Sequence, residues 1–341
     1  MTPSVRLASL AAVDTAIPRQ AFQRAAVRAT LAPSVHNTQP WRFVIRPEAL
    51  EIHADFSRQL RILDPTCRQL IISCGCAVFN ARVSLAADGF TAHVRRYVPG
   101  RNSDLLADFT GSPGDDRALA VLDPVLGLRR TNRRQFAADP VDSELLATLA
   151  NVAAWEGASL FTITEPSHRA AAALLSQRAE VIEEADPGYR SELRAWVTED
   201  QWRGDGVPTA TLPRAREPSR DVVPPMDVPL RNFGDPGDAG MPEDGHTNLN
   251  QCLLVLGTDG DDPLSWLQAG EALERVWLEV TRAGYAMSLF TQVIEVASTR
   301  EELRSQLGLS MQPHVLLRVG RAPATPMSRR RKLVEVLRHV A

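Results

Sequence analysis

Apolar and polar positions alternate along the chain in blocks that predict a mixture of helices and strands. In the first part, the pattern predicts helices over 18–31 and 66–87 and strands over 41–45, 50–56 and 91–98. The second helix is apolar on nearly all sides, so we expect it to be buried, and Asp88-Gly89 is a typical helix end. The polar, glycine-containing stretch 100–116 is predicted to be a connector.

A second series of elements follows this connector. The pattern predicts helices over 142–154, 167–184, 189–196, 263–283 and near 299–307, and strands over 159–164, 252–257, 285–290 and 314–319. Between the helix predicted over 189–196 and the strand predicted over 252–257, residues 202–250 contain eight prolines among glycines and charged residues. A segment of that length without regular structure is usually a lid, an arm or a disordered insert.

The two parts share a spacing of 195 residues. Gly75 and Gly270 lie at this spacing inside the two long apolar helices, and Gly89 and Gly284 lie at the same spacing beyond their ends. A glycine inside a helix costs about 1 kcal/mol, so two at matching places indicate a shared need for close packing. We therefore favour a duplication, with halves at 1–125 and 126–341, over a coincidence between two buried helices.

Composition argues against several classes of protein. The formal net charge is −3 over 341 residues, which provides no field to hold nucleic acid or an anionic membrane. No unbroken apolar stretch is long enough to span a bilayer, and the first 16 residues lack the pattern of a secretory signal. We therefore expect a cytoplasmic protein without nucleic-acid or membrane partners.

Metal chemistry is not expected either. The four cysteines form no C-x-x-C pair, and the seven histidines show no paired spacing. Lys332 is the only lysine, so 37 of the 38 basic residues are arginine. Because this bias raises the chance that arginines cluster by accident, each arginine cluster has to be discounted accordingly.

Two short segments carry candidate chemistry. The first is Pro33-Ser34-Val35-His36-Asn37-Thr38-Gln39-Pro40-Trp41, in which prolines fix the backbone near both ends of a polar loop. A hydroxyl and two amides between the prolines can make oriented hydrogen bonds to the polar edge of a ring. The alternative is an ordinary turn that joins a helix to a strand, but the full string is far more specific than any single residue.

The second segment is Arg129-Arg130-Thr131-Asn132-Arg133-Arg134-Gln135-Phe136, which precedes the helix predicted over 142–154. Arginine binds phosphate through planar, bidentate hydrogen bonds, and the start of a helix also favours anions. A solvated, arginine-rich linker is the alternative, and the arginine bias of the chain gives it weight.

Together, the two segments resemble the nitroreductase superfamily, whose members carry R-R-S-x-R and P-S-x-x-N-x-Q-P-W. Those proteins are α+β homodimers that hold FMN at the interface, with the phosphate on the basic segment of one subunit and the loop supplied by the other. The resemblance covers most of the chain, including Ser328-Arg329-Arg330-Arg331 near its end. The order of the segments is similar to that of the Acg subfamily, in which one chain imitates the whole dimer.

The resemblance implies an α+β, nitroreductase-like fold whose internal duplication forms an intramolecular pseudo-dimer. The second half offers only Ala154-Trp155-Glu156-Gly157-Ala158 where the first has its polar loop, and the residues before Pro18 contain no basic segment. One composite site is therefore kept and its twofold mate is lost. We expect one non-covalent FMN per chain, in a monomer or a weak homodimer.

The resemblance also implies which residues bind the cofactor. The basic residues and Thr131 would meet the phosphate and the ring edge, the polar loop would line the flavin from the other half, and the backbone near Gln292 would reach flavin N5. No catalytic side chain is expected, and His36 is given no catalytic role. The expected FMN-binding residues are Pro33, Ser34, Val35, Asn37, Arg129, Arg130, Thr131, Arg133, Thr291, Gln292, Arg329 and Arg330.

Three functions remain open at this point. By resemblance, the first is an NAD(P)H-dependent reductase, in which the flavin takes hydride from the nicotinamide and passes electrons to a nitro compound or a quinone. The second is a non-enzymatic protein that stores FMN, with residues 202–233 closed over the flavin so that no nicotinamide can stack. The third is a flavin-free interaction protein, and a surface insert that covers nothing is the plain alternative to a lid.

Overall fold

The computed structural model describes residues 17–100, 103–134, 136–200, 202–212, 228, 231–233 and 252–340. Its helices are α1 (Arg19–Ala29), α2 (Arg68–Ala87), α3 (Arg117–Ala120), α4 (Asp123–Leu126), α5 (Ser143–Trp155), α6 (Pro166–Ala185), α7 (Pro187–Ala195), α8 (Pro263–Arg282), α9 (Gln292–Glu295), α10 (Ala297–Gln306) and α11 (Leu333–Val336), with 3-10 turns η1 (Val35–Asn37), η2 (Phe56–Arg58) and η3 (Thr209–Thr211). Its strands are β1 (Trp41–Ile45), β2 (Leu50–Ala54), β3 (Phe90–Arg96), β4 (Leu105–Pro113), β5 (Ser159–Ile163), β6 (Val197–Thr198), β7 (Val207–Pro208), β8 (Cys252–Thr258), β9 (Ala286–Phe290), β10 (Gln312–Gly320) and β11 (Leu337–His339).

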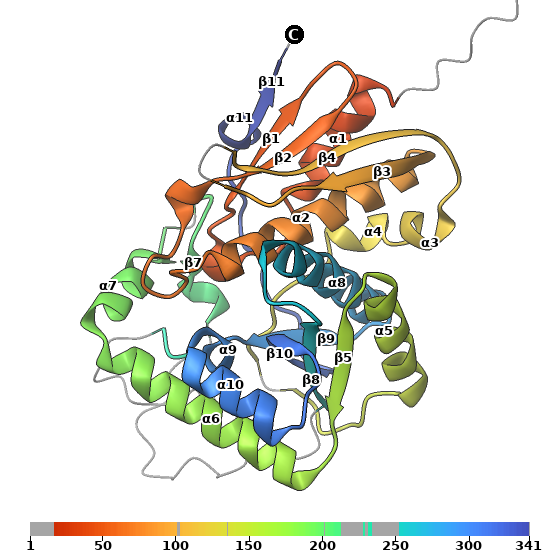
Figure 1. Ribbon diagram of the computed structural model, residues 1–341. Coiled ribbons are helices and arrows are strands. Elements are labelled where there is room, and N and C mark those ends of the chain that lie inside the picture. The colour runs from red at the N-terminus through yellow and green to blue at the C-terminus, as the bar shows by residue number, and fades with distance from the viewer. Residues whose placement is uncertain are drawn as a thin grey trace, which may run out of the picture.

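Two sheets lie on either side of a central pair of helices, α2 and α8 (Figure 1). The first sheet has the order β11-β1-β2-β4-β3 and the second has the order β5-β8-β10-β9. All neighbours are antiparallel except β11, which adds to the edge of the first sheet parallel to β1. The C-terminal segment therefore leaves the second sheet after β10 and completes the first one.

The two central helices form the core that both sheets share. Their apolar faces pack with α1, α5 and the inner faces of the sheets into one large cluster, which contains Trp41, Phe43 and Trp277. By length and composition, helix α2 is apolar enough to cross a membrane, with a mean hydropathy of 1.7 over its most apolar 18 residues. However, 89% of those residues are buried inside the protein. Its apolar character thus serves the core, as the sequence pattern predicts.

The outer face of the second sheet is covered by α6, α9 and α10 (Figure 1). A second cluster fills this layer and includes Phe290, Leu316 and the single placed residue Val228. The second sheet is therefore buried on both faces, whereas α1 and α2 cover only one face of the first sheet. Helix α7 packs elsewhere, with Tyr189 and Leu193 against Leu60 and Leu63.

Most of the predicted elements are confirmed, and one prediction is wrong. Residues 105–113 form β4 in the first sheet, not a connector, and β4 pairs with both β2 and β3. A polar residue such as Asp108 is not expected inside a strand, but here it is buried and accepts hydrogen bonds from Arg95 and Tyr97. Pairing on both sides outweighs the local propensity of a glycine- and aspartate-containing stretch.

The two sheets repeat one topology. The order β1-β2-β4-β3 corresponds to β5-β8-β10-β9, with α2 between β2 and β3 and α8 between β8 and β9. Helix α1 precedes β1 as α5 precedes β5, while α6, α7 and the residues predicted as an insert interrupt only the second series. The predicted duplication therefore has a counterpart in the order of the elements.

Candidate functional site

The loop between α1 and β1 has an unusual backbone. Three of its residues, His36, Asn37 and Gln39, have positive φ angles of 47°, 56° and 50° although none is glycine. Non-glycine residues persist in this region only where surrounding contacts hold them, and such positions cluster at functional sites. Inside the loop, the hydroxyl of Ser34 accepts a hydrogen bond from the backbone N–H of Gln39 at 2.9 Å.

Two distant segments brace this loop. The side-chain amide of Asn37 donates to the carbonyls of Gly206 and Arg329 at 3.0 and 3.1 Å. The amide of Gln39 donates to the carbonyl of Gly204 at 2.8 Å, and its oxygen accepts from the backbone N–H of Arg331. The polar groups that the sequence assigned to a ligand thus hold together the loop, the start of the insert and the C-terminal segment.

The basic segment reaches the same place from the other half of the chain. Asn132 anchors it: its backbone N–H donates to Met287 of β9 at 2.9 Å, and its amide donates to Pro323 at 2.7 Å. Asn132 is almost completely buried. The sequence singled out the neighbouring cations, but this buried amide positions them.

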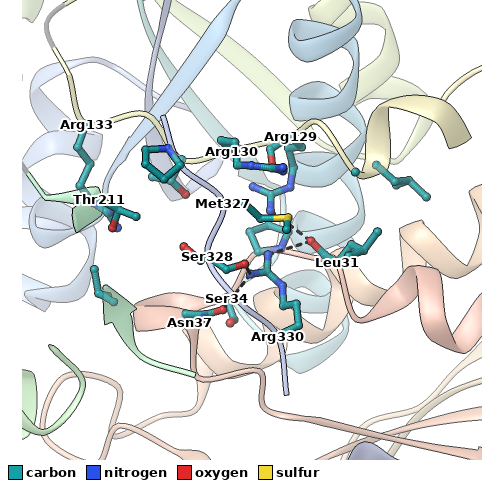
Figure 2. Close-up of a pocket in the computed structure, with 16 residues that line it drawn as sticks. Leu31, Ser34, Asn37, Arg129, Arg130, Arg133, Thr211, Met327, Ser328 and Arg330 are labelled. Atoms are coloured by element: carbon teal, nitrogen blue, oxygen red, sulfur yellow. Dashed lines mark hydrogen bonds between the residues drawn. The ribbon is translucent and has the colours of Figure 1, made fainter. Parts of the chain in front are cut away.

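Two adjoining pockets lie where the loop and the basic segment meet. The first, which we call the cationic pocket, has a volume of about 680 Å³ and is lined by Arg129, Arg130 and Arg330 (Figure 2). The second, which we call the amide pocket, has a volume of about 780 Å³ and is lined by Gln69 and Gln292. Pro33, Ser34, Thr131 and Arg133 line both pockets.

Eleven of the twelve predicted site residues line one or both pockets. The exception is Arg329, whose guanidinium lies 4.5 Å from the ring centre of Trp202, and both of these side chains are exposed. The structure therefore places Arg330 in the cationic pocket and Arg329 outside both pockets. The sequence alone offered no reason to distinguish these two neighbours.

Arg330 closes the C-terminal end of α1. Its guanidinium donates to the carbonyls of Thr30, Leu31 and Ala32 at 3.0 to 3.2 Å, and to the side-chain oxygen of Asn37 at 3.2 Å. These partners are neutral. Burial, and then the charge of Arg129, lower the pKa of Arg330 to about 9, so an anion in the cationic pocket would relieve an unfavourable position.

Arg133 lines both pockets, and no carboxylate of the described residues forms an ion pair with it. Burial, and then the charge of Arg231, lower its pKa to about 10, and its guanidinium lies 5.2 Å from the ring centre of Phe233. No described residue accepts a hydrogen bond from its side chain. A cation in this position favours a ligand that brings negative charge or hydrogen-bond acceptors.

Arg129 is held differently. It is only 4% exposed, and its Nε lies 3.4 Å from a carboxylate oxygen of Glu274, a residue of α8 that is fully buried. One Nη donates to the carbonyl of Leu31 at 3.2 Å, and the guanidinium lies 4.5 Å from the ring centre of Trp277. Arg129 therefore forms the inner wall of the cationic pocket.

The amide pocket contains buried polar atoms without partners among the described residues. These atoms are the side-chain nitrogens of Gln69 and Gln292 and both ring nitrogens of His36. Burial, and then the charges of Arg231 and Arg133, hold the pKa of His36 well below its usual value, so the ring is neutral. Buried polar groups without partners are rare in native proteins, and a ligand with polar edges would satisfy them.

Sequence analysis missed Gln69, and it gave His36 no role. Gln69 lies near the start of the apolar helix α2, where a buried amide stands out among Leu70, Ile71 and Ile72. That contrast is the signal that could have identified it.

Residues 231–233 form one wall of the amide pocket. Arg231 donates to the hydroxyls of Tyr189 and Thr291 at 2.5 and 3.1 Å and forms an ion pair with Glu295. These contacts place Phe233 in the pocket with its ring centre 5.8 Å from that of His36. Of the predicted insert, Val207, Thr211, Arg231 and Phe233 line the two pockets, while most of residues 213–250 lie outside the described part of the chain.

Comparisons with known proteins place this chain among its relatives. The Mycobacterium tuberculosis protein Rv3131, named as an NAD(P)H nitroreductase, is 34% identical over 344 residues, covering 99% of this chain and 97% of that protein. The protein acg from the same organism, also named as an NAD(P)H nitroreductase, is 31% identical over 335 residues, covering 95% and 97%. A nitroreductase structure from Anabaena variabilis shares 10% identity, with a TM-score of 0.49 over 89% of this chain and 88% of that one.

A family model described as the nitroreductase family matches residues 127–321. This range begins just before the basic segment and ends one residue after β10. It covers more than half of the chain, and the two relatives extend the likeness over almost all of it. The chain therefore belongs to the nitroreductase family.

Proposed function

We propose that this chain binds one FMN non-covalently across the two pockets and acts as an NAD(P)H-dependent reductase of nitro compounds or quinones. One observation carries the proposal: a pocket lined by arginines adjoins a pocket lined by two buried amide nitrogens that have no partner among the described residues. FMN has the same division, because its phosphate is anionic and its ring has polar edges.

The residues present fit this cofactor. Arg130 and Arg330 would hold the phosphate in the cationic pocket, and Arg133 would face the junction of chain and ring. Gln69 and Gln292 would bond the ring edges, while the apolar residues Ile72, Leu273 and Leu289 would pack on the ring. When bound, FMN supplies two-electron transfer from NAD(P)H to a small-molecule acceptor. The protein contributes position, positive charge and exclusion of water.

We also propose that residues 1–125 and 126–341 are two nitroreductase-like halves, so that the chain is its own pseudo-dimer. The shared strand order and the contact of α2 with α8 support this division. The family match over 127–321 falls in the second half, while the loop at Ser34 comes from the first. A pseudo-dimer has no need of a partner, so a monomer or weak homodimer is expected. A cytoplasmic location stays a prediction.

The position that corresponds to the amide pocket by the 195-residue spacing is filled with charged side chains. There, Glu271 replaces Cys76 and Arg96 replaces Thr291. Arg96 donates to both carboxylate oxygens of Glu271 at 2.6 and 2.8 Å, and Arg82 donates to one of them at 2.8 Å. These ion pairs support a single flavin site per chain.

FMN storage is the second candidate function, and residues 231–233 favour it. Phe233 and Arg231 line the amide pocket, and Arg231 is tied to Glu295, Tyr189 and Thr291. The neighbouring Asn232 bonds to Glu184 of α6 at 3.2 Å. If this wall covers the exposed face of the ring, it would act as a lid that keeps nicotinamide from stacking.

Anaerobic reduction separates the two functions. NADPH, then NADH, is added to the flavin-loaded protein while the flavin absorbance is followed. Rapid bleaching supports the reductase. A colour that persists with both nucleotides but bleaches with dithionite supports storage. A colourless protein that gains no flavin from added FMN would contradict both.

Phe233→Ala tests the wall directly. Under storage, the variant should become reducible by NADPH, because the ring face is uncovered. Phe56→Ala, which removes a partly exposed phenylalanine of η2 outside both pockets, is the matched control and should behave as the wild type.

A further inference from the structure

Beneath the cationic pocket lies a carboxylate that the proposed function does not use. Glu274 is fully buried in α8, and its Oε1 lies 3.4 Å from Nε of Arg129. Neither carboxylate oxygen has a hydrogen bond of good geometry with a described residue. Burying an ionised carboxylate without hydrogen bonds costs free energy. The groups around Glu274 therefore strongly affect whether it carries a proton.

Arg129 links this carboxylate to the pocket. Its guanidinium is fixed between Glu274, the ring of Trp277 and the carbonyl of Leu31. One of its terminal nitrogens, Nη1, has no partner among the described residues. Figure 2 shows Arg129 beside Arg130, and Arg330 lines the same pocket. An anion in the pocket would therefore contact Arg129, whose guanidinium is paired with Glu274 on its other side.

The charge of the pocket depends on whether Glu274 is protonated. The groups that face it are Arg129 from the basic segment, Arg330 from the C-terminal segment, and Cys76 and Asn80 from α2. Burial raises the pKa of Glu274 to about 7, although Arg129 opposes the shift. The pKa of Cys76 is raised well above its usual value and that of Arg330 is about 9. Between pH 6 and 8, Glu274 is therefore the member of this group that changes charge.

We propose that Glu274 is a positioning residue of the cationic pocket, which orients Arg129 and weakens the retention of phosphate when it is ionised. This inference rests on the proposed function. Its physical basis is that Glu274 and a bound phosphate would both interact with Arg129. An ionised Glu274 neutralises the positive charge of Arg129 that would otherwise attract the phosphate. By linkage, a bound phosphate must favour protonated Glu274 to the same extent.

The test compares FMN with riboflavin, which lacks the phosphate, on the wild type and Glu274→Gln after removal of flavin. Kd is measured by flavin fluorescence at pH 6 and 8. The glutamine keeps the shape and an acceptor for Arg129 but carries no charge. We expect Glu274→Gln to bind FMN at least threefold more tightly than the wild type at pH 8, nearly equally at pH 6, and riboflavin equally at both. Glu274→Ala, which no longer orients Arg129, should bind FMN more weakly at both pH values.

Glu279→Gln is the control, because Glu279 lies on the same helix, is paired with Arg282, and lines neither pocket. It should show the wild-type profile. The inference is overturned if Glu274→Gln and the wild type give the same FMN profile, or if riboflavin shows the same difference. Failure of both flavins to bind would instead reject the proposed function.

A second measurement needs only the wild type, in case the variants do not fold. FMN binding is followed by calorimetry at pH 7.5 in buffers of different ionisation enthalpy. The FMN phosphate is already mostly a dianion there, since its second pKa is about 6. We expect net proton uptake with FMN and none with riboflavin. Binding of FMN without proton uptake would overturn the inference.

Discussion

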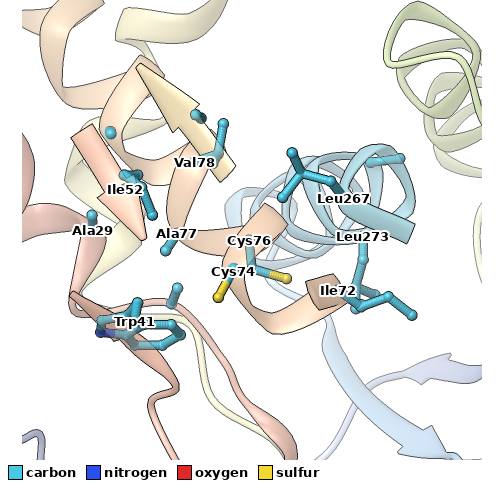
Figure 3. Packing of buried hydrophobic residues seen from close by; sticks show 14 of the residues in the cluster. Ala29, Trp41, Ile52, Ile72, Cys74, Cys76, Ala77, Val78, Leu267 and Leu273 are labelled. Atoms are coloured by element: carbon cyan, nitrogen blue, oxygen red, sulfur yellow. The ribbon is translucent and has the colours of Figure 1, made fainter. Parts of the chain in front are cut away.

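Gly75 of α2 and Gly270 of α8 face each other where the two central helices cross, so that each Cα occupies the space that a side chain of the other would need. Figure 3 shows the surrounding core, with Cys76 of α2 and Leu273 of α8 among the labelled residues. A Cβ on Gly75 would lie 2.9 Å from Cα of Gly270, and a Cβ on Gly270 would lie 2.8 Å from Cα of Gly75. The close packing that the matching glycines predict is confirmed. The helices meet backbone to backbone in the core that both sheets share.

Alanine at either glycine should therefore destabilise the protein although alanine is the better helix former. A gain of about 1 kcal/mol from helix propensity is opposed by backbone contacts that cannot move without separating α2 from α8. We expect Gly270→Ala to lower the free energy of unfolding by about 2 kcal/mol or more in denaturant titrations. Gly100→Ala, at a glycine with open space around it, should change it by less than about 0.5 kcal/mol. Equal effects of the two substitutions would contradict this packing argument.

Arg329 and Arg330 are adjacent in sequence but should differ in their effect on flavin retention. Arg330→Gln removes a cation that lines the cationic pocket, so we expect FMN to bind at least tenfold more weakly in fluorescence titrations. Arg329→Gln removes a cation that stacks on the exposed Trp202 and should leave the Kd within about twofold. The placement of the phosphate is wrong if the two variants lose FMN equally.

Gln292→Leu should stabilise the flavin-free protein and weaken flavin binding. The amide nitrogen of Gln292 is buried in the amide pocket and has no partner in the described part of the chain, so an apolar residue of similar size removes a desolvation cost of about 1 kcal/mol. The same change removes a hydrogen-bond donor to the flavin ring, so FMN should stabilise the variant less than the wild type. Thermal unfolding with and without FMN measures both effects. Loss of stability in both states would show that Gln292 serves the fold.

Three buried carboxyls should lower the stability of the flavin-free protein as the pH rises from about 4.5 to 7, whereas the buried His36 and His314, whose pKa values are lowered, act in the opposite direction. Burial raises the pKa values of Asp64, Glu180 and Glu274 to about 7 in the folded chain, far above those of exposed carboxyls. In this range the unfolded chain has lost protons that the folded chain keeps, so each carboxyl removes on the order of 2 kcal/mol as the pH rises.

Glu180→Gln isolates one part of this effect. The variant keeps an oxygen that can accept from the backbone N–H of Asn232, as Glu180 does in the wild type. Urea titrations across the pH range should give a shallower slope than the wild type below pH 7. An unchanged slope in the variant would contradict the assignment.

Sequence by itself determined the elements whose signal is local. Helical spacing located α2 and α8, the matching glycines indicated their contact, and the proline-bracketed loop and the arginine segment were recognised as parts of one site. These features follow from residues close together in the chain, where side-chain period and turn chemistry act directly.

Tertiary structure decided what depends on partners far away in the chain. Residues 105–113 became β4 because two strands pair with them, and Asn37 and Gln39 proved to brace the insert and the C-terminal segment. Neighbouring Arg329 and Arg330 contact different partners, Trp202 and the carbonyl of Leu31, and Glu274 lies next to Arg129. Burial and hydrogen-bond partners set these roles, and both arise only when segments a hundred or more residues apart are brought together.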